Sequence, residues 1–89
     1  MDIVKVNQLP PEDEDYAAVV KYVSPKDGRI THYLTGSAVT GGSAVFLKSE
    51  YGRYDSEEEA ISVAKSFAVE HGFDRVLIVD QTNKDDQNG

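Results

Sequence analysis

The sequence predicts a single small α+β domain in which an antiparallel sheet carries one helix on one face. Residues 56–80 have the signals of a helix followed directly by a strand. Before them, residues 16–48 contain three apolar runs separated by turn residues, which is typical of an antiparallel meander. A chain of 89 residues has room for one core. We therefore expect the element order β-β-β-α-β within one domain at residues 15–80.

The meander is expected from three strands. The first, at residues 16–23, is largely apolar on both faces, as in a central strand. Pro25 and the Asp27-Gly28 pair predict a tight turn after it. The second strand is expected at 29–35 and the third at 44–48. The glycine-rich stretch between them predicts a hairpin end rather than a phosphate-binding loop, because another strand follows it instead of a helix.

The helix is expected to begin at a capping box. Ser56 and Glu59 have the spacing at which each side chain bonds a free backbone N–H of the first turn. Gly72 stands where a left-handed residue commonly ends a helix, and the β-branched run at 75–80 predicts a strand directly afterwards. The residues that recur at helical spacing and predict one stripe are Ala60, Ala64, Phe67, Ala68 and His71, and Ile61 and Val63 widen it.

The last strand is expected to join the sheet beside the first. A right-handed crossover through the helix makes these two strands parallel. The predicted core consists of apolar residues that the strand and helix periods assign to the inside: Val20, Tyr22, Ile30, Leu34, Phe46, Ile61, Ala64, Phe67, Ala68, Leu77 and Val79.

The two ends of the chain are expected to lie outside the domain. Residues 1–14 predict a flexible acidic N-terminal arm, because Pro10-Pro11 precedes a run of four carboxylates that repel one another. The carboxylates lack the spacing of a calcium-binding loop. A short strand at Ile3–Val6 is an open alternative within this arm. Residues 81–89 are polar and predict a disordered C-terminal tail.

The composition excludes several classes of site. There is no cysteine, so disulfides, thiolate metal sites and thiol nucleophiles are absent. No apolar run reaches the length of a membrane span and the N-terminus has no basic leader, so we expect a cytoplasmic protein without membrane contact. The two histidines, His32 and His71, belong to no catalytic or metal-binding motif. We therefore expect no catalytic, cofactor-binding or metal-binding residues, and a protein that is not an enzyme.

The leading functional hypothesis is a non-catalytic protein-interaction module that self-associates through its uncovered sheet face or an edge strand. One helix covers one sheet face, yet the first and last strands are apolar on both faces. A second copy of the chain, or another protein, would cover the remaining face. A homodimer is the expected form.

Two alternatives come from the charge pattern. The net charge is −7, but residues 21–53 hold five basic and two acidic side chains and so carry +3. Cations interleaved with tyrosines suit nucleic acid, although the overall negative charge makes this partner unlikely. The candidate contacts are Lys21, Arg29, Lys48, Arg53 and Tyr33. The acidic helix and tails also permit a DNA mimic that inhibits a DNA-binding protein.

Overall fold

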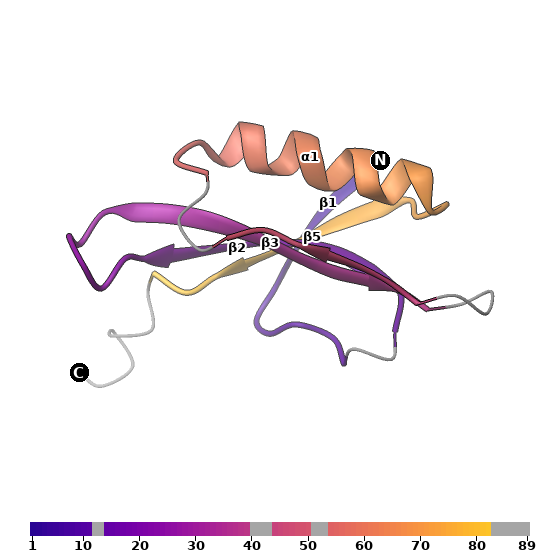
Figure 1. Ribbon diagram of the computed structural model, residues 1–89, viewed down its shortest axis with the longest axis horizontal. Helices are drawn as coiled ribbons and strands as arrows, with labels where there is room; N and C mark the ends of the chain where they lie inside the picture. Colours follow the sequence, from indigo (N-terminus) through magenta and orange to yellow (C-terminus); the bar gives the residue numbers. More distant parts are fainter. Residues whose placement is uncertain (12–13, 40–43, 51–53, 83–89) are drawn as a thin grey trace.

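Five strands form one mixed sheet in the order β1-β5-β2-β3-β4, and one helix lies across it (Figure 1). The computed structural model describes residues 1–11, 14–39, 44–50 and 54–82. The prediction of a single α+β domain with one helix on one sheet face is confirmed. The elements are β1 (Asp2–Val6), β2 (Tyr16–Val23), β3 (Ile30–Ala38), β4 (Val45–Lys48), α1 (Glu57–Glu70) and β5 (Arg75–Asp80).

An antiparallel meander describes only part of this sheet. Strands β2, β3 and β4 are antiparallel as expected, and β5 pairs in parallel with β2, also as expected. The correction concerns β1, which pairs in parallel with the outer side of β5 and makes the sheet mixed and five-stranded. Four consecutive residues of β5 are buried, so its backbone groups need partners on both sides.

Residues 2–6 of the expected N-terminal arm are therefore part of the sheet. They supply the strand that was open as an alternative at Ile3–Val6, with one more residue at its start. Its parallel register sets Val4 beside Leu77 and Val6 beside Val79. Residues 12–13 of the arm and 83–89 of the tail lie outside the described residues.

Helix α1 begins and ends where the capping signals predict. The Ser56 hydroxyl accepts a hydrogen bond from the Glu59 N–H at 3.3 Å. At the other end, Gly72 has a φ of +80°, and the Phe73 N–H donates to the Ala68 carbonyl at 2.7 Å. Glycine is the residue that adopts this conformation without steric cost. The turn directs the chain at once into β5.

The helix packs on the sheet through a stripe of alanines. Ala60, Ala64 and Ala68 are fully buried, and Ile61 and Phe67 flank them half-buried. The helix lies over β2, β3 and β5. Because alanine has only a methyl group, the helix backbone lies close to the sheet and leaves little space between them. The buried sheet residues beneath it are Ala17, Val19, Leu34 and Val76.

The core predictions are wrong at two positions. Ile30 is 51% exposed at the start of β3, and Phe46 is 52% exposed on the outermost strand. Strand alternation assigns each residue to one face of the sheet. It does not show how much of that face the rest of the chain covers. Tyr22 is half-buried, as are the two residues that flank the alanine stripe. The other predicted core residues, all buried, are Val20, Leu34, Ala64, Ala68, Leu77 and Val79.

The face opposite the helix is partly covered by the chain itself. The connection from β1 to β2 runs beneath the sheet in Figure 1, on the side away from α1. From this connection Leu9 packs, together with Val4 and Val6 of β1, against a buried cluster of Tyr16, Ala18 and Leu77. A second copy is therefore not needed to bury the part of this face formed by β5 and β2.

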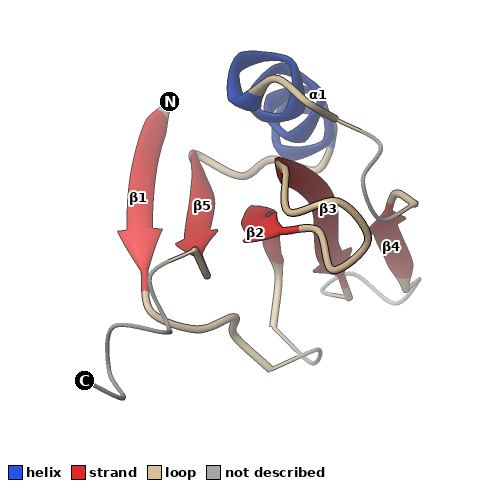
Figure 2. Cartoon of the chain, turned by 90° about the vertical axis from the view of Figure 1, so that its left-hand side faces the viewer, coloured by secondary structure: helices blue, strands red, loops and turns tan. Residues whose placement is uncertain are grey.

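The two crossover connections have the same hand. Strands β4 and β5 run parallel, and α1 joins them across one face. Strands β1 and β2 also run parallel, and their connection crosses the opposite face in the opposite direction along the sheet (Figure 2). A crossover keeps its handedness when both its sheet face and its direction along the sheet are reversed. The two crossover connections therefore have the same handedness.

Enlarging the alanine stripe should destabilise the fold. We expect Ala64→Leu to lower the free energy of unfolding by about 1–3 kcal/mol, because the added atoms have no space between helix and sheet. Ser62→Leu makes a similar change at an exposed helix position and should alter stability by less than about 0.5 kcal/mol. Urea unfolding followed by circular dichroism measures both. Equal stability of the two variants would contradict the close packing of α1.

Candidate interaction surface

Strand β4 lies at one edge of the sheet and, within the described ranges, pairs on one side only. The Ser49 N–H donates to the Leu34 carbonyl at 3.2 Å, which shows which residues next to β3 have backbone groups that point toward it. Hydrogen-bonded pairs alternate along an antiparallel ladder, so Leu47 also bonds to β3. The backbone N–H and C=O of Phe46 and Lys48 consequently point outward, away from β3.

This edge has few of the features that usually prevent strand addition. Its exposed side chains include Val45 (40%) and Phe46 (52%), and Lys48 is its one charged residue. Natural edge strands are commonly protected by charges, proline or a bulge. The opposite edge, β1, carries both Asp2 and Lys5 within five residues. The two sheet edges therefore differ, and β4 is the one suited to pairing.

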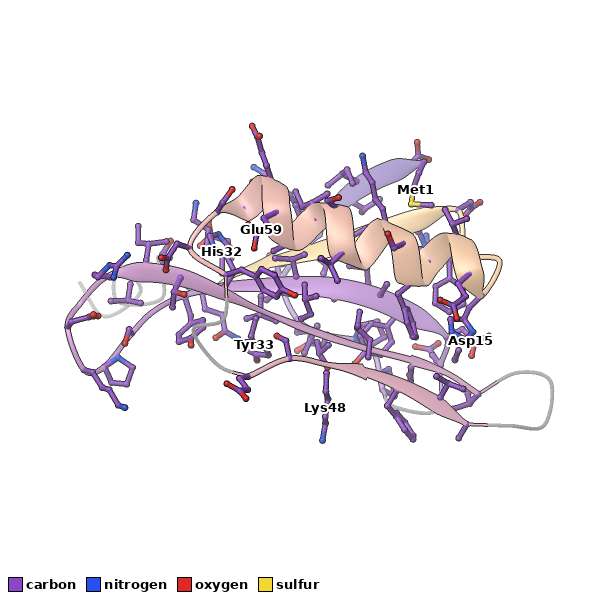
Figure 3. The ribbon with its side chains drawn as sticks, turned by 45° about the horizontal axis from the view of Figure 1, so that its top comes forward. Met1, Asp15, His32, Tyr33, Lys48 and Glu59 are labelled. Carbon is purple, nitrogen blue, oxygen red and sulfur yellow. The ribbon has the colours of Figure 1, made fainter. Side chains whose placement is uncertain are left out.

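Several side chains of β3 and β4 share the face opposite the helix. The register aligns Thr35 with Lys48 and, two residues along, Ser37 with Phe46. Tyr33 belongs to the same face and packs edge-on against Tyr22, with ring centroids 5.5 Å apart. Figure 3 shows Lys48 extending away from the helix. Two hollows of about 230 and 260 Å³ adjoin Thr35 and Lys48. Both are smaller than typical small-molecule sites, so this region is better suited to surface contact.

The structure does not bring the predicted cationic residues together. Lys21 Nζ lies 4.0 Å from Glu57 Oε2 of the helix, and Arg29 Nη2 lies 3.2 Å from Asp55 Oδ2. Lys48 lies on the helix-free face with Tyr33, and Arg53 is outside the described residues. Two of the cations thus have carboxylate neighbours near the start of α1, while the third lies across the sheet.

His32 occupies a structural position beneath the start of the helix. It is 3% exposed, and its Nδ1 lies 3.0 Å from the Tyr54 carbonyl oxygen. The same oxygen accepts the His32 N–H at 2.9 Å and the Thr31 hydroxyl at 3.1 Å. These contacts fasten the segment before α1 to β3. They hold Tyr54 along the same edge of β3 that β4 occupies farther on.

The carboxylates that flank β5 are not arranged for acid–base catalysis. Asp74 precedes the strand and Asp80 ends it, so they are separated by its length of about 20 Å. Hydrogen bonds from the Thr82 hydroxyl and N–H hold the pKa of Asp80 below its usual value, and they form a turn. Within the described ranges no three histidine or carboxylate side chains are placed to hold a metal ion. No described helix is long and apolar enough to cross a membrane.

Comparison with known families, curated proteins and solved structures finds no match to this chain. The surface therefore has to be interpreted from its own geometry. Sequence reasoning identified Tyr33 and Lys48 but missed Phe46, which it assigned to the core. The absence of proline and the single charge in 45–48 are visible in the sequence and could have indicated an open edge.

The separation of the cations predicts that nucleic acid does not bind. In about 50 mM salt, titration of labelled single- and double-stranded oligonucleotides should give no saturable change in anisotropy, because only a contiguous set of cations releases enough counterions. Saturable binding that weakens with salt and is lost in Lys48→Gln would overturn this expectation.

Proposed function

We propose that this protein is a non-catalytic interaction module that self-associates by antiparallel pairing of β4 with β4 of a second copy. The observation that carries the proposal is the open edge at Phe46 and Lys48, whose backbone groups point away from β3. A partner strand would bond these groups and would cover the exposed side chains of Val45 and Phe46.

Symmetry restricts how two such edges can pair. Antiparallel pairing requires a two-fold axis perpendicular to the sheet, so both helices lie on the same side of one continuous sheet. A register centred on Leu47 sets each Phe46 beside the partner's Lys48, a cation–aromatic pairing. It also avoids placing the two Lys48 side chains directly opposite each other. All of residues 44–50 take part in this register.

The net charge of −7 opposes association and gives it a characteristic salt dependence. Two like-charged copies repel over distances that salt shortens. Apolar and backbone contacts at β4 are little affected by salt in this range. Self-association is therefore expected to strengthen as salt is added, whereas binding to a polyanion weakens.

Sedimentation velocity over a dilution series in the micromolar range tests the proposal. We expect a concentration-dependent dimer that is favoured by added salt. Phe46→Pro should give a monomer, because proline removes an outward N–H without removing a bond to β3. Circular dichroism should show the variant folded. A wild-type protein that stays monomeric at every concentration would contradict the proposal.

A matched pair of lysine variants tests whether self-association uses β4 or the other sheet edge, β1. Phe46→Lys and Ile3→Lys each replace an exposed apolar residue of an edge strand and change the net charge equally. Phe46→Lys should raise the dissociation constant about tenfold or more, equivalent to about 1.4 kcal/mol. Ile3→Lys should change it less than about twofold. Equal effects would place the contact elsewhere.

A further inference from the structure

Strand β1 is held to the domain by its ladder with β5 and by one pair of side chains. Within the described ranges it pairs with β5 alone, in parallel. Figure 2 shows β1 at the edge of the sheet, beside the helix rather than beneath it, and α1 packs on β2, β3 and β5. Asp2, Ile3 and Lys5 are exposed, and the half-buried Val4 and Val6 supply the apolar contacts of the strand. Strand β1 therefore adds little to the core beneath α1.

Strand β5 differs from β1 in that its central residues, Val76 to Val79, are all buried. On its other side β5 pairs in parallel with β2. If β1 leaves, β5 keeps this second ladder and presents a row of free backbone groups along its outer edge. On the helix-free face, Leu77 belongs to a buried cluster with Tyr16 and Ala18. An extended segment with apolar side chains at alternate positions fits such an edge.

The connection from β1 to β2 is fastened to the sheet at its far end. The Ser37 hydroxyl donates to the Glu14 carbonyl at 2.6 Å, and Asp15 Oδ1 accepts the Val39 N–H at 2.7 Å. Both bonds tie the end of the connection to the end of β3, so β2 keeps its place when β1 moves. Two adjacent prolines precede this anchor and offer no backbone N–H to the sheet. Strand β1 and the chain up to Leu9 therefore form a unit that can detach without disturbing β2.

We propose that β1 is a displaceable strand and that the outer edge of β5 binds an extended segment with the same pattern. The segment adds in parallel and sets β-branched residues against the buried cluster, as Val4 and Val6 do. Its intervening residues are polar, because that side of β1 is largely exposed. Without such a segment β1 stays closed, and it acts as an internal competitor. The apparent affinity is then reduced in proportion to the small fraction of chains in which β1 is open.

A synthetic peptide of residues 1–9, titrated into the ¹⁵N-labelled full chain, tests this proposal. Bound peptide should release the chain's own β1, so the β1 amide signals move to disordered positions while those of β2 and β3 stay. Val6→Asn weakens the chain's own strand and should tighten peptide binding about tenfold or more. Ile3→Asn makes a similar change on the exposed side of the same strand and should alter binding less than about threefold. Phe46→Lys should bind the peptide as the wild type does, so the result does not depend on self-association.

Three outcomes would overturn the proposal. One is the absence of peptide binding to the Val6→Asn chain while circular dichroism shows it folded. Another is equal tightening by Val6→Asn and Ile3→Asn, because the contact beneath the sheet would then be irrelevant. The third is loss of the whole fold in Val6→Asn, together with wild-type β1 amides that exchange as slowly as those of β2. That result would place β1 in the same cooperative unit as the core.

Discussion

Burial of strand β2 on both faces is the constraint on which the rest of this structure depends. On one face the alanine stripe of α1 covers Ala17 and Val19, and on the other the β1–β2 connection packs near Ala18. The close fit extends to β3, where a Cβ on Gly36 would lie 2.5 Å from the Tyr16 carbonyl oxygen. The sheet order follows, because β5 and β3 must occupy the two sides of β2.

This arrangement determines which surface remains available. The helix and the β1–β2 connection together cover β5, β2 and part of β3, and β4 extends beyond them at the edge. Val45 and Phe46 are left exposed there, as are Val23 and Ile30 at the other end of β2 and β3 and Ile3 on β1. The sequence left two places open for self-association, an uncovered sheet face and an edge strand, and the function proposed above uses the edge strand.

The parts of the fold that local chemistry specifies could be predicted from the sequence. Ser56 and Gly72 marked the ends of the helix, and the strand alternation gave the meander and the parallel position of β5. What could not be predicted depends on contacts between distant residues. The sequence around Leu9 does not show that this residue packs against the cluster of Tyr16, Ala18 and Leu77. The periodicity of Phe46 likewise cannot show that β4 lies beyond the part of the sheet that the helix and the β1–β2 connection cover. The described candidate cations are also spread over the sheet for a reason of this kind, because alternation and register place Lys21 and Lys48 on opposite faces.

Native-state hydrogen exchange at several protein concentrations tests most directly whether the chain itself buries β2 and leaves β4 open. The amides of β2 and β5 should stay protected even when the protein is dilute, because both strands are paired on both sides within one copy. The Phe46 and Lys48 amides should exchange rapidly when dilute and slowly when concentrated, whereas the Leu47 amide stays protected throughout. Rapid exchange of β2 in the dilute protein would contradict the account, because it would show that a second copy is needed to complete the core.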